Sequence, residues 1–338
     1  MYLTFEQVKD AVRGAVRVEE QEGKIAFYRF SESEQEVYRL YGRKAEFYPK
    51  TFHTSSIRLA FTTNSSYLAF DFSQGEFPVK ARVTMDVYED DAIIQSISLD
   101  FRCMPEGRLH IPLQAKETRV EIYFPFNCPL RISNVELEDG ASFASYRRPY
   151  KVLTLGDSIT HGSSAGYPSL SYAAHLARLL KADFINKGIG GEHFFPELLT
   201  APEAETPDWI TVAYGTNDWK HCTREELCEH AGEVMRKLTE FYPGRPIFVI
   251  SPLWRADYKQ ETPFGAPTDQ VHEALCGVAA EFPDVTVIHG WNLVPHEKHF
   301  FADSRLHPND LGFGIYAANL YREMIPHLIE KIGYSFHQ

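Results

Sequence analysis

A serine and a histidine occupy positions in this sequence where they could act as a nucleophile and its base. Ser158 ends the tripeptide Gly156-Asp157-Ser158, directly after the short apolar stretch 152–155, and His307 precedes Pro308. A serine hydroxyl is a poor nucleophile unless a base removes its proton, and histidine can do so near neutral pH. All three residue types of the tripeptide also favour turns, so the tripeptide alone does not establish a site.

Two further segments could donate hydrogen bonds to an oxyanion. Gly188-Ile189-Gly190-Gly191 follows a second apolar stretch, and Gly215-Thr216-Asn217-Asp218 follows a third. A glycine backbone N–H, the side-chain amide of Asn217 and the N–H of Ser158 itself are donors suited to a tetrahedral oxyanion. The alternatives are that the glycines only permit a positive φ and that Asn217 is a turn or cap residue.

The second half of the sequence alternates between strand and helix patterns, which would bring these segments together. Strands are expected at 152–155, 183–186, 209–214, 247–250 and 285–288, and helices at 171–180, 223–241, 269–282 and 310–332. This alternation predicts a doubly wound α/β/α domain with a five-stranded parallel sheet. The loops that follow successive strands of such a sheet meet at its carboxyl edge, so their polar residues can converge.

The first half has a different pattern. From about residue 24 to 139, apolar residues alternate with polar ones in short runs separated by turn residues, as in Leu68-Phe70-Phe72. This predicts an antiparallel β-sandwich, jelly-roll-like, of roughly eight strands. A short helix is expected within 4–17, and a linker at 142–150. We therefore expect two domains, 1–147 and 148–338.

Composition limits the classes of partner. The hydrophobic content of 44% and charged content of 24% are typical of a globular protein. A net charge of −12 argues against a nucleic-acid partner. No apolar run reaches the ~18 residues of a membrane helix, and no signal peptide is visible, so we expect a cytoplasmic protein without a membrane partner. The five cysteines are scattered without metal-ligand spacing, and His289, His296 and His299 lack a helical pair of ligands. We expect no metal and no other cofactor, and leave a homo-oligomer open.

Taken together, the four blocks that end in Ser158, Gly191, Asp218 and Pro308 resemble the SGNH, or GDSL-type, hydrolases. Their order and placement match, over about the last 190 residues. The resemblance implies an esterase with Ser158 as nucleophile and His307 as base. It also implies an oxyanion hole formed by Ser158, Gly191 and Asn217. A β-sandwich ahead of such a domain resembles the arrangement in some carbohydrate esterases, including two-domain deacetylases of plant polysaccharides.

The sequence departs from this family three residues before the histidine. The family pattern places an aspartate there, whereas this chain has Ser304, with Asp303 one residue further back. A one-residue bulge would still let Asp303 reach the ring of His307, and we favour this arrangement as the third catalytic residue. The alternatives are a Ser–His dyad oriented by Ser304 or a backbone carbonyl, and a solvated Asp303 without a role.

Four side chains are candidates for substrate binding. Trp219, Trp254 and Trp291 follow strand ends and could stack on a sugar, although partial burial explains each of them equally well. His193, like His161, would form a wall of the site. We expect a serine esterase that hydrolyses a small ester, O-acetyl on a sugar or oligosaccharide. The alternatives are a lipid esterase, a thioesterase or an acyltransferase of the same fold, and a non-catalytic carbohydrate-binding protein.

Overall fold

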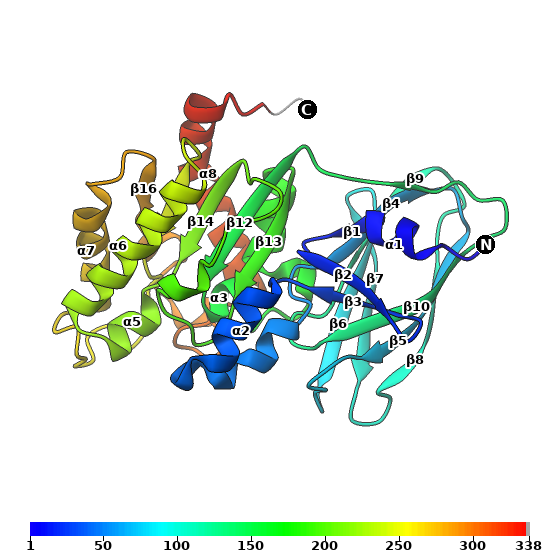
Figure 1. The fold of residues 1–338 in the computed structure, drawn as a ribbon, viewed down its shortest axis with the longest axis horizontal. Coiled ribbons are helices and arrows are strands. Elements are labelled where there is room, and N and C mark those ends of the chain that lie inside the picture. The colour runs from blue at the N-terminus through cyan, green and yellow to red at the C-terminus, as the bar shows by residue number, and fades with distance from the viewer. Residues whose placement is uncertain (336–338) are drawn as a thin grey trace.

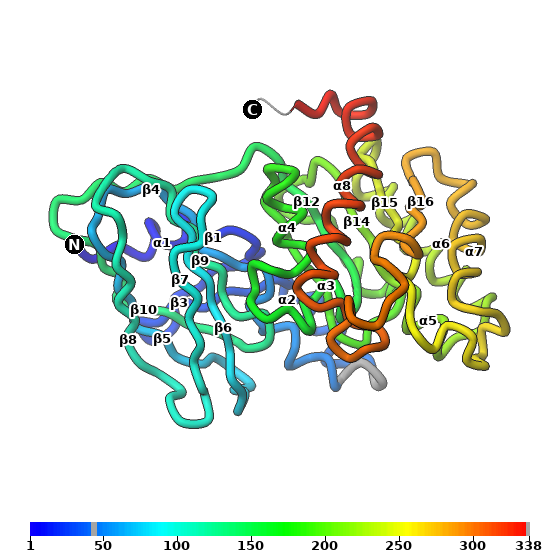
Figure 2. Tube along the Cα trace, turned by 180° about the vertical axis from the view of Figure 1, so that it is seen from behind, coloured from blue at the N-terminus to red at the C-terminus, as the bar shows by residue number. Residues whose placement is uncertain are grey.

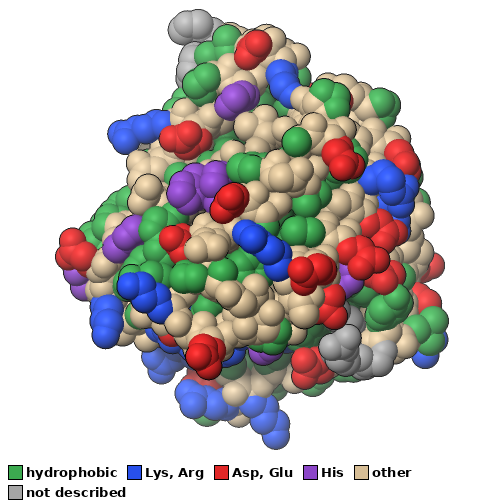
Figure 3. All heavy atoms as spheres, turned by 90° about the vertical axis from the view of Figure 1, so that its left-hand side faces the viewer, with side chains coloured by type: hydrophobic (Ala, Val, Ile, Leu, Met, Phe, Trp, Pro, Cys, Tyr) green, Lys and Arg blue, Asp and Glu red, His purple; other side chains and the backbone are tan. Residues whose placement is uncertain are grey.

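The chain folds into a β-sandwich followed by a parallel sheet covered by helices (Figure 1). The computed structural model describes residues 1–335, apart from the side chains of residues 42–45. No helix in this described part is both long enough and apolar enough to cross a bilayer. On the face shown in Figure 3, acidic and basic side chains are interspersed with hydrophobic and uncharged ones, so the negative net charge is not concentrated there.

The two sheets of the sandwich pair their strands antiparallel, in the orders β1-β4-β9-β6-β7 and β2-β3-β10-β5-β8. On β5, Leu68, Phe70 and Phe72 alternate with more exposed or small residues and are buried in the core between the sheets. The expected antiparallel sandwich is therefore confirmed. Its strands are β1 (Val12–Arg13), β2 (Arg17–Gln21), β3 (Lys24–Tyr28), β4 (Arg58–Thr63), β5 (Tyr67–Gln74), β6 (Arg82–Glu89), β7 (Ala92–Asp100), β8 (Glu106–Pro112), β9 (Thr118–Tyr123), β10 (Leu130–Leu137) and β11 (Ala144–Ser145).

Two segments of this half differ from the expectation. The first helix, α1 (Phe5–Ala11), has the expected cap at Thr4 but ends early, because strands begin at Val12. The segment 32–52, expected to belong to the strand pattern, is helical: α2 (Glu32–Leu40) is followed by the 3-10 helix η1 (Gly42–Phe52). Ser31 caps α2 through a reciprocal capping box with Glu34.

The connection at 142–150 is an ordered part of the sandwich and not a free linker. Strand β11 pairs with β4, aligning Ala144 with Thr62. Arg148 is only 8% exposed, because its guanidinium bonds Glu121 on β9.

The parallel sheet has the strand order β13-β12-β14-β15-β16, as expected for a doubly wound fold. Helices α4 and α8 cover one face, in front in Figure 2, and α6 and α7 cover the opposite face, in front in Figure 1. This confirms the predicted five-stranded α/β/α domain. Its strands are β12 (Tyr150–Gly156), β13 (Ala182–Gly188), β14 (Trp209–Ala213), β15 (Ile247–Ile250) and β16 (Val285–Ile288). Its helices are α3 (Ser158–His161), α4 (Tyr172–Leu179), α5 (Thr216–His221), α6 (Arg224–Phe241), α7 (Val271–Ala279) and α8 (Asp310–Ile332), with 3-10 turns at Pro168–Leu170, Pro196–Leu198, Thr268–Gln270, Gly290–Asn292 and Lys298–Phe300.

Helix α2 and η1 leave the sandwich and pack against the parallel-sheet half, close to α3 (Figure 1). Their apolar contacts form one buried cluster across the two halves: Phe30, Tyr38 and Phe47 from the first half, and Ile189, Phe195 and Leu198 from the second. The N-terminal half therefore reaches the carboxyl edge of the parallel sheet, where Gly188 ends β13.

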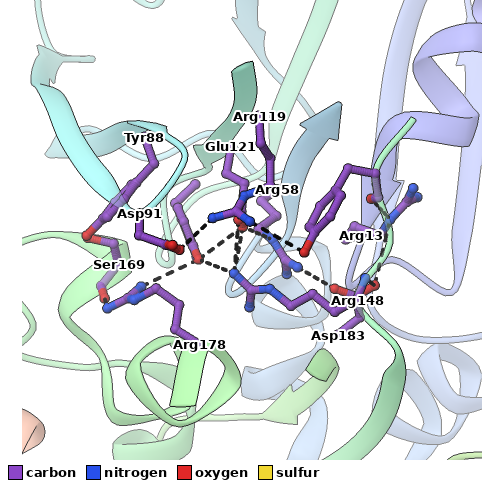
Figure 4. A network of polar contacts seen from close by, with 12 residues as sticks. Arg13, Arg58, Tyr88, Asp91, Arg119, Glu121, Arg148, Ser169, Arg178 and Asp183 are labelled. Carbon is purple, nitrogen blue, oxygen red and sulfur yellow. Dashed lines mark hydrogen bonds and ion pairs between the residues drawn. The ribbon is translucent and has the colours of Figure 1, made fainter. Parts of the chain in front are cut away.

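A second contact between the halves is a buried network of charges (Figure 4). Arg58 on β4 is 2% exposed and pairs with Glu121 on β9 at 2.8 Å and with Asp183 on β13. Arg148 joins Glu121 at 2.8 Å. Burial would raise the pKa of Glu121, but Arg58 and Arg148 outweigh that effect and lower its pKa to about 2. The carboxylate is thus held ionised between two guanidinium groups.

Candidate active site

Ser158 stands where strand β12 turns into helix α3. Asp157 caps this helix, since its Oδ1 accepts the Ile159 N–H at 2.9 Å. A side chain at Gly156 would collide with Thr160, so the strand can turn this tightly only with glycine there. As the first residue of a helix, Ser158 has a backbone N–H without an intrahelical partner.

The structure brings His307 to this serine from the other end of the domain. His307 Nε2 lies 2.9 Å from Ser158 Oγ. His307 belongs to a short loop that is closed by a bridge between Phe301 and Pro308 and by a 2.8 Å hydrogen bond from the Ala302 N–H to the His307 carbonyl. Asn309 then caps α8. The imidazole is therefore fixed between a closed loop and a helix start.

Asp303 lies on the opposite side of the imidazole from Ser158. Its Oδ2 is 2.9 Å from His307 Nδ1, and its Oδ1 accepts the backbone N–H groups of Leu306 at 2.8 Å and His307 at 3.1 Å. The additional residue of the loop, Ser304, has a φ of 56°, which is the bulge that makes this contact possible. With the proton on Nδ1, the lone pair of Nε2 faces the serine hydroxyl.

The pKa of Asp303 fits this arrangement. Burial would raise the pKa of Asp303, but the Leu306 N–H and the His307 ring outweigh that effect and hold its pKa well below the usual range. The carboxylate therefore stays ionised and can stabilise a protonated imidazole.

The oxyanion candidates lie on the two neighbouring loops. Gly190 is beside Ser158, since a Cβ on Gly190 would be 3.6 Å from Ser158 Cβ. Gly191 has a φ of 94°, which favours glycine. Asn217, in the first turn of α5, donates one amide hydrogen to the Glu192 carbonyl at 2.9 Å, which leaves its second amide hydrogen for another acceptor.

Two buried acids, Asp157 and Asp218, support these loops, and the sequence pattern predicts a role for neither of them. Asp218 accepts the N–H of Gly215 at 3.0 Å and the N–H of Phe194 at 3.0 Å, and so joins the Gly191 loop to the Asn217 loop. Asp157 is 3% exposed, and burial raises its pKa to about 7, although the Ile159 N–H opposes this shift. The only signal in the sequence is that each acid adjoins a site residue.

The expectation that His161 forms a wall of the site is wrong. His161 is buried and holds the backbone of Gly190. Its Nδ1 accepts the N–H of Gly190 at 3.3 Å, and its ring stacks on His53 with the centroids 5.4 Å apart. Burial lowers the pKa of His161 far below its ordinary value, and the nearby Arg29 lowers it further. The ring is therefore neutral and can accept the Gly190 hydrogen.

The tryptophans divide into two groups. Trp219 is fully buried and donates to the Ala266 carbonyl, so the expectation that it stacks on a substrate is wrong. Trp254 is half-buried, stacks on His296 at 5.7 Å between centroids and contacts Phe301, which closes the His307 loop. Trp291 packs edge-on against the same His296. Trp254 and Trp291 thus remain partly exposed, and Trp254 adjoins the His307 loop through Phe301.

A cleft of about 1030 Å³ opens beside Gly191 and Asn217. His193, which we predict as a wall residue of the site, lines this cleft. Its remaining walls include Tyr41, which connects α2 to η1, and residues of η1, none of which the sequence pattern predicts as site residues. The lining consists of Tyr41, Glu46, Phe47, Lys50, Gly190, Gly191, His193, Phe194, Phe195, Pro196, Glu197, Asn217, His221, Cys222 and His230.

Within the residues that the structure describes, no three histidine, cysteine or acidic side chains are grouped as metal ligands. His299 and Glu297 approach each other to 3.4 Å as an exposed pair.

Comparison with known proteins supports the fold and the family. Residues 154–315 match the model of the GDSL-like Lipase/Acylhydrolase family, and no curated protein sequence matches the chain. Among solved structures, the chain is similar to the salicylyl-acyltransferase SsfX3 of a tetracycline biosynthetic pathway (TM-score 0.79, 21% identity, 96% of each chain). It is also similar to a family two carbohydrate esterase from Cellvibrio japonicus (TM-score 0.66, 16% identity, 97% of each chain). A third similar structure is an acetyl xylan esterase, Est2A, from the rumen bacterium Butyrivibrio proteoclasticus (TM-score 0.63, 15% identity, 99% of each chain). Residues 154–315 are therefore similar to the GDSL-like Lipase/Acylhydrolase family, and the chain shares its fold with these solved structures.

Proposed function

We propose that the protein is a serine esterase in which Ser158 is the nucleophile, His307 the general base and Asp303 the residue that orients His307. The observation that carries this proposal is the pair of 2.9 Å contacts, from Ser158 Oγ to His307 Nε2 and from His307 Nδ1 to Asp303 Oδ2. Acyl transfer requires a nucleophile, a base that contacts it, and a group that orients the base, and these three groups are hydrogen-bonded in series here.

The reaction proceeds in two steps. Ser158 Oγ attacks the ester carbonyl carbon while His307 takes its proton, and the oxyanion is held by the N–H groups of Ser158 and Gly191 and the amide of Asn217. His307 then protonates the leaving alcohol, and an acyl-enzyme on Ser158 remains. Water, activated by His307, attacks this acyl-enzyme and releases the carboxylic acid.

For the substrate we propose a small acyl ester, O-acetyl on a sugar or oligosaccharide. His307 must reach the leaving oxygen, so the alcohol part of the substrate lies on the His307 side of the serine. Trp254 contacts Phe301, which closes the His307 loop, and Trp291 packs against the same His296, so we assign these two partly exposed rings to the alcohol part of the substrate. Aromatic faces of this kind stack on sugar rings. Two similar structures are a carbohydrate esterase and an acetyl xylan esterase.

The test is Ser158→Ala with a chromogenic acetyl ester and with acetylated xylo-oligosaccharides. We expect the alanine variant to lose turnover on both while its thermal unfolding is unchanged. The unmodified enzyme should give a burst of chromophore if deacylation is slow. Comparable turnover by the alanine variant would refute the assignment of the nucleophile.

A second candidate is an acyltransferase, which transfers a larger acyl group to an alcohol instead of to water. Two observations favour it: the cleft of about 1030 Å³ beside Gly191, which exceeds what an acetyl group needs, and the similarity to a salicylyl-acyltransferase. A panel of aromatic and aliphatic acyl esters, assayed with and without added alcohols, distinguishes the two candidates. Faster turnover of bulky acyl esters together with ester formation supports transfer.

A further inference from the structure

The loop that carries Gly191 is a tight turn with a defined orientation of its central peptide. The Glu192 N–H bonds the Ile189 carbonyl at 3.1 Å, and Gly191, at the third position, has a φ of 94°. These are the features of a type II turn. Type I and type II turns differ mainly by a flip of the central peptide, here Gly190–Gly191. That flip decides where the Gly191 N–H points.

A lysine from the N-terminal half contacts this peptide. Lys50, on η1, donates from Nζ to the Gly190 carbonyl at 2.7 Å. The ring of Phe47 lies 4.4 Å from the same ammonium and also covers Gly191, where a Cβ would approach it to 3.1 Å. The ammonium is therefore partly shielded from water, which strengthens its interaction with the carbonyl.

The backbone around Lys50 is fixed by one buried guanidinium. Arg29 is fully buried and donates to the Lys50 carbonyl at 3.1 Å, to the His53 carbonyl at 2.8 Å and to the Gly188 carbonyl at 3.0 Å. Arg29 thus ties η1 to the end of β13, two residues before Gly190. His161 holds the N–H of Gly190 from the other side.

We propose that Lys50 is a positioning residue that keeps the Gly190–Gly191 peptide turned so that its N–H can bind the oxyanion. In a trans peptide the C=O and the N–H point in opposite directions, so a cation on the carbonyl directs the N–H away from Lys50. The positive charge also polarises the peptide and makes this N–H a stronger donor. Within the described residues, the Gly191 N–H forms no hydrogen bond of its own. This inference rests on the proposed esterase reaction.

The charge of Lys50 depends on pH. Burial lowers the pKa of Lys50, while Glu46 on the same helix and Glu192 on the facing loop oppose this shift. The other titratable rings nearby, His53 and His161, have pKa values lowered by burial and stay neutral when Lys50 titrates. The ammonium is therefore present at neutral pH and is lost in alkali earlier than that of an exposed lysine.

The test compares kcat and KM of Lys50→Met, Lys50→Gln and Lys50→Arg on a chromogenic acetyl ester. Loss of an oxyanion donor lowers kcat on the order of 10²-fold or more. Lys50 only positions such a donor, so we expect Lys50→Met to lower kcat roughly tenfold and to change KM by no more than about twofold. Lys50→Gln keeps a hydrogen-bond donor without the charge, so its kcat should lie between those of Lys50→Met and the wild type. The matched control is Lys237→Met: Lys237 makes the same kind of contact, 2.8 Å to the Pro196 carbonyl, and should leave kcat unchanged.

The pH profile separates positioning from a general loss of structure. The kcat of the wild type should fall on the alkaline side as Lys50 loses its proton. This limb should be absent in Lys50→Met and should move to higher pH in Lys50→Arg, because a guanidinium keeps its proton. A raised KM with unchanged kcat in Lys50→Met would instead make Lys50 a substrate anchor and overturn the proposal. An unchanged alkaline limb in Lys50→Met would overturn it as well. Either result, alongside an inactive Ser158→Ala, leaves the proposed esterase reaction intact.

Discussion

Asp303 Oδ2 lies 2.9 Å from His307 Nδ1, although the loop between them is one residue longer than the family spacing. Ser304 accommodates the additional residue by adopting a φ of 56°. Asp303 Oδ1 accepts hydrogen bonds from the backbone N–H groups that follow it, including that of Leu306. The carboxylate therefore both shapes the loop and contacts the imidazole. These two roles can be separated by substitution.

We expect Asp303→Asn to lower kcat/KM on an acetyl ester at least tenfold. An amide cannot stabilise the imidazolium, and the loss of a triad carboxylate costs up to ~10⁴ in kcat in serine proteases. Ser304→Gly is the matched control for the loop: glycine adopts a positive φ without strain, so activity should be retained and thermal stability should be equal or higher. A loss below tenfold in Asp303→Asn would favour a Ser158–His307 dyad.

Much of the candidate site could be predicted from the sequence because Ser158, Gly191 and Asn217 follow apolar strands. The alternation of strand and helix gave the sheet, and the carboxyl edge of a doubly wound sheet gathers the residues that follow its strands. Trp219 and Trp254 both follow strands, however, and only packing decides that the first is buried and the second partly exposed. The role of Lys50 could not be predicted from the sequence, because its partner is a backbone carbonyl 140 residues away along the chain.

Asn217→Ala should lower kcat by on the order of 10²-fold and change KM little. Its free amide hydrogen would serve the oxyanion, which forms only in the transition state. The bond from Asn217 to the Glu192 carbonyl is also lost, so the thermal midpoint should be recorded in parallel. A raised KM with an unchanged kcat would show that Asn217 binds the substrate ground state instead.

Glu121→Gln should alter the pH dependence of stability. The pKa of Glu121 is lowered from its ordinary 4.5 to about 2 in the folded chain, so its ionised form stabilises the fold above pH 4.5. This contribution is lost as the pH falls from 4.5 through 2. The glutamine variant should be less stable than the wild type at neutral pH, because Arg58 and Arg148 lose their shared carboxylate. The difference in free energy of unfolding between the two proteins should decrease below pH 4.

The control for this prediction is Glu36→Gln on α2. Glu36 pairs with Arg39 at the surface, where ion pairs contribute little to stability. Urea unfolding at several pH values should show parallel curves for this variant and the wild type. Parallel curves for Glu121→Gln as well would show that the buried network does not control acid unfolding.

The final prediction concerns residues 1–147, which the sequence pattern marked as a domain. In the structure, Arg58 pairs with Asp183 and the Phe47 ring covers Gly191, so this half contributes charged and apolar groups to the other half. Expressed alone, the fragment would expose the aromatic side chains of its contact cluster, among them Tyr38 and Phe47. We therefore expect strand and some helix in its far-UV spectrum, but a lower urea midpoint than that of the full chain and strong binding of a hydrophobic dye. An equal midpoint without dye binding would show instead that the sandwich is stable alone and that the contact between the halves serves the active site only.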